Sequence, residues 1–203
     1  MTCGQRFARL VTRLVVRQPA LWALLRAPLG RQFDRLAPSW DARRGIRHLE
    51  PALDAVEQAP ARILDLGTGT GRAAAVLARR WPEADVLGVD VSPGMVAEAR
   101  RSLPPELAGR VRFEVADAAR LPYEDAAFDL VVLANMIPFF DELARVVAPG
   151  GHVAFGFSNA AGTPIYVPPE RLRAELGRRG FSDFAEFAAA GGTSLLARRT
   201  DRA

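Results

Sequence analysis

The stretch at residues 63–72, I-L-D-L-G-T-G-T-G-R, decides the fold of this chain. It begins as a short apolar run, carries one carboxylate at Asp65, and then places Gly67, Gly69 and Gly71 at alternate positions before an Ala-rich stretch. This order predicts a strand, a tight turn and a helix, because a sharp turn needs backbone angles that a Cβ disfavours. The free N–H groups and the positive dipole end of the helix start favour a ligand there. The stretch is therefore a candidate small-molecule site.

The composition is that of one globular domain without a nucleic-acid signature. The chain has 203 residues, of which 49% are hydrophobic and 25% are charged, values near the globular average. The net charge is +4, but all 27 basic residues are Arg and they are spread along the chain without a block of five. We therefore expect an ordinary basic surface and no nucleic-acid partner.

The cysteine and histidine content argues against a metal centre. Cys3 is the single cysteine, and His48 and His152 lie far apart in the sequence, so neither a cysteine cluster nor a histidine-rich metal site is expected. Four arginines interrupt the apolar residues between positions 6 and 17. Because neither a signal-peptide core nor a membrane-spanning helix fits this pattern, we expect a cytoplasmic protein.

Residues 5–27 predict an amphipathic basic helix that ends or bends at Pro19, with a second short helix around Trp22. Two interpretations stay open, since such a helix can lie on an anionic membrane surface or pack on its own domain and roof the ligand site. Residues 31–44 are too short and Pro-broken for one regular helix. We treat residues 1–45 as an N-terminal helical cap segment and residues 46–203 as the main domain.

Strands and helices alternate through the rest of the chain, and a hairpin ends it. We expect strands at residues 62–66, 85–89, 111–115, 128–134 and 152–157, and helices at residues 46–58, 73–80, 92–103, 140–147 and 168–180. Residues 181–187 and 193–198 flank two glycines and predict an antiparallel hairpin. The pattern implies an α/β, doubly wound, Rossmann-like sheet of seven strands with an antiparallel edge.

Polar residues stand at the carboxyl ends of four expected strands: Asp65, Asp90, Asp117 and Asn135. In an open α/β sheet these ends meet in one crevice where the strand order reverses, and ligands bind there. Asp90 follows the last glycine by 19 residues, a spacing that suits a carboxylate binding two ribose hydroxyls. Helix capping explains Asp90 equally well when it is taken alone.

Asp65 decides between classes of nucleotide ligand. The glycines form G-x-G-x-G instead of the dinucleotide pattern G-x-G-x-x-G, and no Lys is present for a Walker motif. A carboxylate two residues before the first glycine opposes a pyrophosphate. The same carboxylate suits a cationic ligand.

Five segments resemble, in order and spacing, the motifs of class I S-adenosylmethionine-dependent methyltransferases. They read I-L-D-L-G-T-G-T-G, V-L-G-V-D-V-S-P-G-M, V-A-D-A-A-R-L-P, F-D-L-V-V and L-A-R-V-V-A-P-G-G-H-V. The resemblance covers about residues 35–198 and is greatest to the small-molecule branch that includes ubiquinone and menaquinone biosynthesis methyltransferases. R-L-A-P-S-W-D at residues 35–41 is similar to the segment that in this branch precedes the domain and touches both ligands.

The resemblance implies S-adenosylmethionine as the cofactor and a role for each residue of the first motif. Asp65 would orient the methionine portion, directly or through water. The backbone of the turn would wrap the same portion, through Gly67, Thr68, Gly69 and Gly71. The sulfonium already activates the methyl group, so such a protein chiefly holds a nucleophile in line with it.

The later motifs would bind the adenosine portion and close the pocket. By resemblance, Asp90 would bind the ribose hydroxyls and Val91 would pack on the adenine. Asp117 would accept a hydrogen bond from the adenine amino group, with the Ala118 N–H near the ring. Two residues after the fourth strand would meet the methionine amine beside the methyl group, Ala134 and Asn135. For Asn135, satisfying a backbone group at the strand end is an equally open interpretation.

The acceptor and the catalytic residues stay unassigned at this stage. Met136, Ile137, Phe139 and Phe140 either face a small, partly apolar acceptor or pack in the core. A general base is needed only when the nucleophile must lose a proton. The residues near the expected mouth are Tyr166, Asn159 and Asp141, while His48 is expected on the surface, and none is assigned as catalytic.

Three functions fit the sequence. The first is methyl transfer from S-adenosylmethionine to a small metabolite. The others are a non-catalytic cofactor-binding or scaffold protein of the same fold, and a membrane-peripheral enzyme acting on a quinone or lipid. No N-P-P-Y or D-P-P-Y signature of nucleic-acid methylation follows the fourth strand.

Overall fold

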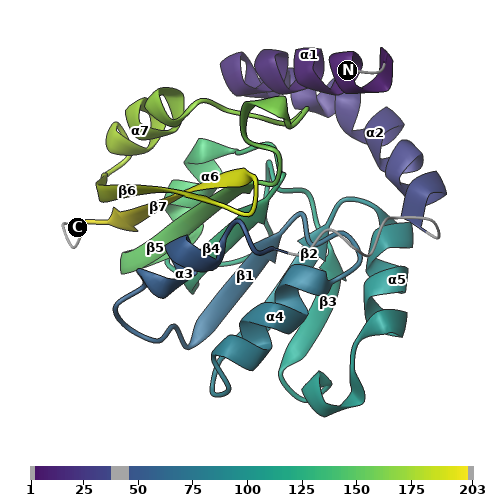
Figure 1. The fold of residues 1–203 in the computed structure, drawn as a ribbon. Helices are drawn as coiled ribbons and strands as arrows, with labels where there is room; N and C mark the ends of the chain where they lie inside the picture. Colours follow the sequence, from purple (N-terminus) through teal and green to yellow (C-terminus); the bar gives the residue numbers. More distant parts are fainter. Residues whose placement is uncertain (1–2, 38–45, 201–203) are drawn as a thin grey trace.

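The computed structural model describes residues 3–37 and 46–200, and its centre is a seven-stranded sheet with the order β3-β2-β1-β4-β5-β7-β6 (Figure 1). The first five strands run parallel, and β7 pairs antiparallel with both β5 and β6. The strands are β1 (Arg62–Leu66), β2 (Asp85–Asp90), β3 (Val111–Val115), β4 (Phe128–Ala134), β5 (Val147–Phe157), β6 (Phe181–Ala189) and β7 (Gly192–Arg199). The doubly wound sheet with its antiparallel terminal hairpin is confirmed.

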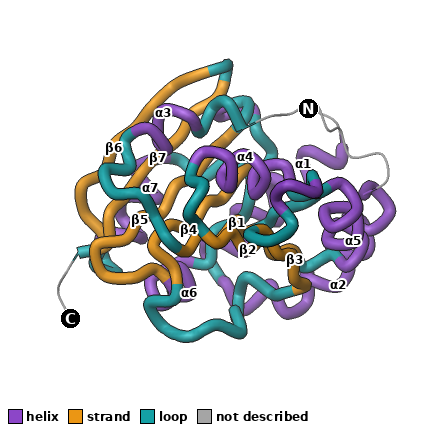
Figure 2. The backbone as a smooth tube through the Cα atoms, turned by 90° about the horizontal axis from the view of Figure 1, so that it is seen from below, coloured by secondary structure: helices purple, strands orange, loops and turns teal. Residues whose placement is uncertain are grey.

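Helices cover both faces of the sheet, as Figure 2 shows for α3 and α4 on one side and α6 on the other. The α-helices are α1 (Cys3–Arg17), α2 (Trp22–Leu36), α3 (Glu50–Asp54), α4 (Arg72–Arg80), α5 (Pro93–Ser102), α6 (Phe140–Val146) and α7 (Pro169–Gly177). Alternate residues of β4 enter opposite cores, because Val131 and Leu133 pack with α6 and α7 while Leu130 and Val132 pack with α3 and α4. A continuous apolar run is the pattern of a strand buried on both faces.

The N-terminal helices lie over the carboxyl ends of the parallel strands (Figure 1). A short 3₁₀ turn at Pro19–Leu21 separates α1 from α2, which confirms the bend expected at Pro19. The expectation of irregular chain from residue 31 onwards was wrong as far as residue 36, because α2 continues through Pro28 to that point. Burial of Gly30 close to Val91 and hydrogen bonds from α5 to Asp34 stabilise this second half of α2. The remainder of the 31–44 prediction lies at residues 38–44, outside the described chain.

The helix expected at residues 46–58 was also wrong, since only Glu50–Asp54 is helical. Pro51 occupies the first turn of α3, where its missing N–H costs no hydrogen bond. Ile46 and Leu49 are buried in turns before the helix. The periodic apolar residues therefore mark a buried face correctly but not a regular helix.

His48 was expected on the surface and is instead 3% exposed. A Cβ on Gly156 of β5 would lie 2.7 Å from the His48 Nε2, and a Cβ on Gly192 would lie 2.7 Å from the His48 Cβ. Burial lowers the pKa of the His48 imidazole, although the nearby Gly156 carbonyl raises it. The two glycines make room for a neutral imidazole against the sheet.

β5 begins five residues earlier than expected, at Val147. Pro149-Gly150-Gly151 was expected to close the preceding helix and lies inside the strand instead. The register shifts between Phe128 and Leu130 of β4, and Gly150 has a φ of +74°. A proline is tolerated in a strand at such an irregularity, because its missing N–H then leaves no gap in the hydrogen-bond ladder.

At Gly71 both the backbone conformation and the packing oppose a side chain. It is the N-cap of α4 with a φ of +81°, and a Cβ there would lie 2.6 Å from Phe113 Cζ and 3.0 Å from Ala99 Cβ. Gly191, in the hairpin turn, has a φ of +75° but no heavy atom within 4 Å of its Cβ position. The two glycines share a backbone constraint and differ in packing.

We predict that Gly71→Ala lowers the free energy of unfolding by about 2 to 4 kcal/mol, from left-handed strain plus overpacking. The matched variant Gly191→Ala carries only the backbone cost, about 1 to 2 kcal/mol. Urea denaturation of both variants measures the difference. Equal losses in the two variants would contradict the packing role of Gly71.

Candidate active site

The parallel strands bring the predicted polar residues to one edge of the sheet. Asp65 pairs in register with Gly88 of β2 and Val132 of β4, and Asp90 pairs with Val115 at the end of β3. The strand order reverses between β1 and β4. This is the position at which open α/β sheets bind ligands.

The turn after β1 has the backbone that its glycines predict. Gly67, Gly69 and Gly71 have φ values of +75°, +54° and +81°. The N–H groups of Gly67 and Thr68 both donate to the Val89 carbonyl at 2.9 Å, which ties the turn to β2. The glycines therefore serve a turn that the neighbouring strand holds in place.

Asp65 is a fully buried carboxylate with one satisfied and one unsatisfied oxygen. Its Oδ2 accepts from the Thr68 hydroxyl at 2.6 Å and from the Ala74 N–H at 3.0 Å. Its Oδ1 is buried without a hydrogen-bond partner among the described residues. The pKa of Asp65 is raised to about 6, because burial and, to a smaller extent, repulsion from Asp90 outweigh the two hydrogen bonds that lower it.

A buried carboxylate oxygen without a donor is costly, and natural structures retain one only when something else compensates. A cationic donor at Oδ1 would supply that compensation and would favour the ionised carboxylate. The residues at this strand end thus fit a ligand that carries an ammonium group. They do not fit a phosphate.

Asp90 lies beside the turn and holds its backbone. Its Oδ2 accepts from the Gly69 N–H at 3.0 Å, and its Oδ1 accepts from the Ser92 N–H at 2.9 Å. Burial raises the pKa of Asp90, while these hydrogen bonds lower it. Ser92 itself caps α5 by accepting from the Met95 N–H, as expected. Each oxygen of Asp90 has a further lone pair for a ligand hydroxyl.

Asp34 of α2 is a site residue that the sequence did not identify. Its Oδ1 accepts from the Ser92 hydroxyl at 2.6 Å and from the Gly94 N–H at 2.9 Å. These hydrogen bonds hold the pKa of Asp34 below its ordinary value. Asp34 and Ser92 are 58 residues apart, and no sequence spacing rule relates residues at that distance.

Asp117 is engaged by the N-terminal helices. Its Oδ1 accepts from the Trp22 indole N–H at 2.6 Å and from the Ala119 N–H at 3.0 Å, and its Oδ2 pairs with Arg26 at 3.0 Å. Trp22 is 5% exposed and its ring packs edge-on against Phe139. Of the four lone pairs of the carboxylate, one on Oδ2 remains for another donor.

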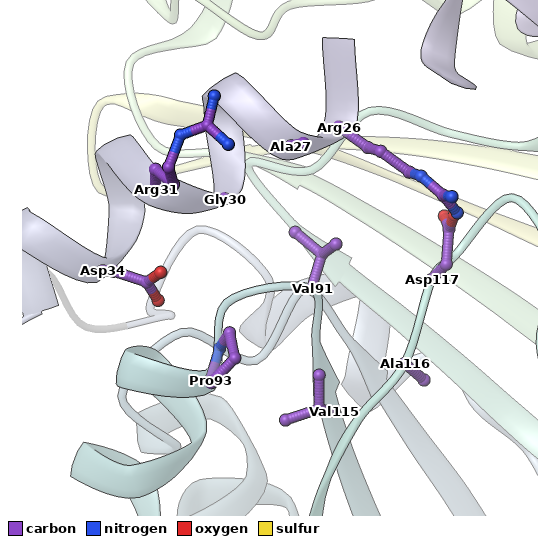
Figure 3. Close-up of a pocket in the computed structure, with 10 residues that line it drawn as sticks. All are labelled: Arg26, Ala27, Gly30, Arg31, Asp34, Val91, Pro93, Val115, Ala116 and Asp117. Carbon is purple, nitrogen blue, oxygen red and sulfur yellow. The ribbon is translucent and has the colours of Figure 1, made fainter. Parts of the chain in front are cut away.

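A cavity of about 380 Å³ lies between α2 and the ends of β2 and β3 (Figure 3). Figure 3 shows the Arg26 side chain reaching to Asp117 at one end and the Asp34 carboxylate at the other, with Val91 and Val115 between them. Ten residues line it: Arg26, Ala27, Gly30, Arg31, Asp34, Val91, Pro93, Val115, Ala116 and Asp117. An apolar slot with carboxylates at its ends suits a flat heterocycle that carries hydrogen-bond donors.

A second cavity, of about 430 Å³, lies between α4 and α5 and has Thr70, Gly71 and Arg72 at one end. None of the strand-end carboxylates lines it. Of the strand-end carboxylates, Asp117 lines the first cavity, whereas Asp65 and Asp90 line neither cavity.

The residues at the end of β4 form hydrogen bonds with the end of β5. Asn135 has a φ of +54°, and its Oδ1 accepts from the Ser158 N–H at 2.9 Å. Its N–H donates to the Gly156 carbonyl at 2.8 Å. The structure thus supports the alternative interpretation, in which Asn135 satisfies backbone groups at the strand ends. Ala134 lies beside it and is half-buried.

Core packing explains most of the apolar segment after Asn135. Ile137, Phe139 and Phe140 are between 4% and 7% exposed and belong to one hydrophobic core. Only Met136 is half-buried, and its Sδ lies 2.7 Å from the position of a Cβ on Gly67. Of Met136, Ile137, Phe139 and Phe140, Met136 is the residue that packs against the glycine turn.

The residues considered as general bases have structural partners. The Asp141 carboxylate pairs with Arg179 at 2.6 Å, and the backbone N–H of Asn159, not its side chain, donates to the Thr163 hydroxyl. Tyr166 packs edge-on against Phe157, and burial raises the pKa of its phenol. No group of three or more potential metal ligands occurs in residues 3–37 and 46–200. No helix in those ranges is long and apolar enough to cross a membrane.

Comparison with known families identifies the core of the chain. Residues 63–151 match the family model described as a methyltransferase domain. These residues are similar to a methyltransferase domain. The match begins at the first residue of the glycine motif and ends within β5, so it contains the turn and all four strand ends described above. The resemblance to class I S-adenosylmethionine-dependent methyltransferases of small molecules is confirmed.

Curated relatives carry similar methyltransferase sequences. The chain is 43% identical over 137 residues to a demethylmenaquinone methyltransferase of Thermus thermophilus, an alignment that covers 60% of this chain and 61% of the relative. It is 42% identical over 132 residues to a trans-aconitate 2-methyltransferase of Methylobacterium nodulans, covering 57% and 48%. The chain thus spans roughly half to three fifths of these relatives.

A solved structure confirms the fold of the methyltransferase domain and its surroundings. The crystal structure of human N-acetylserotonin methyltransferase in complex with S-adenosylmethionine matches this chain with a TM-score of 0.62 and 18% sequence identity. The match covers 89% of this chain and 58% of the human one. At this identity the likeness concerns the fold.

We predict that Asp65→Asn stabilises the ligand-free protein at pH 7.5. A folded-state pKa of about 6 against 3.8 for the ordinary carboxyl means that the folded state binds the proton more tightly than the unfolded state. Stability is therefore lost as pH rises from about 4 to 6, by up to about 3 kcal/mol. Asn keeps an acceptor for Thr68 and Ala74 without the charge.

Urea denaturation at pH 7.5 and pH 4 checks this prediction. The variant should exceed the wild type by about 1 to 3 kcal/mol at pH 7.5 and by little at pH 4. Asp85→Asn, at an exposed position at the start of β2, serves as the control and should show no such difference. A less stable Asp65→Asn at pH 7.5 would contradict the raised pKa.

Proposed function

We propose that this protein binds S-adenosylmethionine at the carboxyl end of its sheet and transfers the methyl group to a small metabolite. The observation that carries the proposal is the buried, unpartnered Oδ1 of Asp65 beside the glycine turn. S-adenosylmethionine carries an ammonium group that would satisfy this oxygen. The family of residues 63–151 supports the same ligand.

The cofactor-binding residues proposed here are those implied by the sequence motifs. The methionine portion is held at β1, by Asp65, Gly67, Thr68, Gly69 and Gly71. The adenosine portion is held across β2 and β3, by Asp90, Val91, Asp117 and Ala118. The end of β4 closes the pocket, with Ala134 and Asn135.

Two features of the structure refine these roles. Both oxygens of Asp90 and the Oδ1 of Asn135 already accept hydrogen bonds. Asp65 has a buried oxygen without a partner among the described residues, so we assign the ammonium group to Asp65. Trp22 and Arg26 already bond to Asp117, so an adenine amino group there shares the carboxylate with α2. We infer that α2 forms one wall of the adenosine pocket.

When bound, S-adenosylmethionine supplies a methyl group on a cationic sulfur, which a nucleophile can accept without further activation. The protein's part is to orient the two reactants and exclude water, and orientation alone supplies about 7 to 11 kcal/mol in favourable cases. Asp65 fixes the amino-acid end, and Asp90 fixes the turn through the Gly69 N–H. No protein base is assigned, and the carboxylate of Asp141 is already paired with Arg179.

The acceptor class is proposed from the relatives, whose names include demethylmenaquinone, trans-aconitate and malonyl-[acyl-carrier protein] as methylated substrates. These are small molecules or small groups on a carrier. We propose a small, partly apolar metabolite and no nucleic acid. The division at residue 45 and the cytoplasmic location remain predictions.

Calorimetric titration with S-adenosylmethionine tests cofactor binding. We expect binding to the wild type at pH 7.5 and a loss of about tenfold or more in affinity for Asp65→Asn, since a hydrogen bond to a charged group contributes about 1.5 to 3 kcal/mol. Below pH 6 the wild-type affinity should fall by up to about tenfold per pH unit, because the Asp65 proton must leave. Asp85→Asn should behave as the wild type at every pH. The absence of wild-type binding, or equal binding by Asp65→Asn, would refute the cofactor assignment.

Methyl transfer itself needs a separate measurement. We expect the wild type to move label from methyl-labelled S-adenosylmethionine into a small molecule of a metabolite extract, and Asp90→Ala to lose this activity. Asp85→Asn should retain it. Cofactor binding with no labelled product in any extract would favour the non-catalytic, scaffold alternative.

A further inference from the structure

Helix α1 carries two apolar stripes, and only one of them packs on the protein. Val11 and Val15 are 3% and 1% exposed and belong to the core beneath the helix. Thr12 lies on the same side and is 1% exposed. This stripe accounts for the packing of α1 on its own chain.

The second stripe faces outward. Phe7, Leu10 and Leu14 are 50%, 54% and 41% exposed, and at about 100° per residue they fall within about 60° of one another on the helix. In the described residues six large hydrophobic side chains are exposed, and three of them form this stripe. Figure 1 shows α1 as the outermost element over the carboxyl ends of the strands, with its outer side uncovered.

The net positive charge of the chain is concentrated on α1. The helix contains four Arg and no acidic residue, and the chain as a whole has a net charge of +4, so positive and negative residues elsewhere balance. Arg6, Arg13 and Arg17 are exposed and form no ion pair with any described residue. Viewed down the helix axis, the three arginines lie within about 60° of Leu10. They therefore border the exposed stripe.

The fourth arginine fixes the orientation of the helix. One nitrogen of the Arg9 guanidinium donates to the carbonyls of Ala161 and Thr163 at 2.6 and 2.9 Å, in the loop after β5. Together with Val11 and Val15, this bond anchors the inner face of α1 to the domain. The exposed stripe is therefore held outward as one surface with Arg6, Arg13 and Arg17.

We propose that this surface, Phe7, Leu10 and Leu14 with Arg6, Arg13 and Arg17, docks the protein on an anionic lipid bilayer. The apolar side chains enter the boundary between head groups and acyl chains, and the arginines contact lipid phosphates. A second copy of the chain is the poorer occupant, because two α1 helices face to face bring arginines together with no acidic partner on either helix. The proposal does not depend on methyl transfer.

Co-sedimentation with lipid vesicles tests the proposal on the full chain. One set of vesicles is phosphatidylcholine alone, and in the other about a third of the lipid is phosphatidylglycerol. We expect binding to the anionic vesicles, little binding to the neutral ones, and a loss of binding on raising the salt from about 0.1 M to about 0.5 M. Absence of binding to the anionic vesicles, or equal binding to both, overturns the proposal.

Variants separate the two parts of the surface. Leu10→Gln with Leu14→Gln keeps helix propensity and should lower anionic-vesicle affinity at least tenfold, and Arg13→Gln with Arg17→Gln should lower it about fivefold for each Arg removed. Val76→Gln, at an exposed position of α4, and Arg112→Gln, at an exposed position of β3, are the controls. Circular dichroism confirms folding in each case. Equal losses in the controls, or a dimer in light scattering that only the leucine variant disrupts, overturn the proposal.

Discussion

The buried carboxylate of Asp65 is the interaction on which the site depends. Its Oδ2 joins three elements at once, because Asp65 ends β1, Thr68 lies in the glycine turn and Ala74 lies in the first turn of α4. Its other oxygen has no donor among the described residues, and burial of the carboxyl raises its pKa to about 6. The fold therefore bears the cost of an incompletely satisfied charge at the point where a cationic ligand would bind. A strained or destabilised group at a binding site is a common compromise between stability and function.

The N-terminal helices complete this site. Asp34 holds the start of α5 through Ser92 and Gly94, and Trp22 with Arg26 holds Asp117 after β3. These contacts turn an open sheet edge into a cavity of about 380 Å³. The sheet supplies the carboxylates, whereas the helices supply the enclosing wall, and the outer side of the same helical layer carries the arginine and leucine surface of α1.

Local patterns predicted the strands well and the segments before and after them less well. Apolar residues located β1, β3 and β4, and the Ser-Pro pair located the start of α5, because these signals act within a few residues. The helix expected at residues 46–58 was wrong since its apolar periodicity reflects burial of Leu49 and Leu53 in a mostly irregular segment. His48 was misplaced for the same reason, as only the tertiary structure shows that Gly156 and Gly192 leave space for it.

The sequence by itself determined the doubly wound sheet, the glycine turn and the preference of Asp65 for a cationic ligand over a phosphate. These follow from backbone sterics and from charge, which residues carry with them wherever they fold. The tertiary structure decided which oxygen of Asp65 lacks a donor, that the Oδ1 of Asn135 accepts from Ser158, and that Trp22 donates to Asp117. Such contacts join residues far apart in the chain, so their geometry exists only once the sheet and its helical layer have packed together.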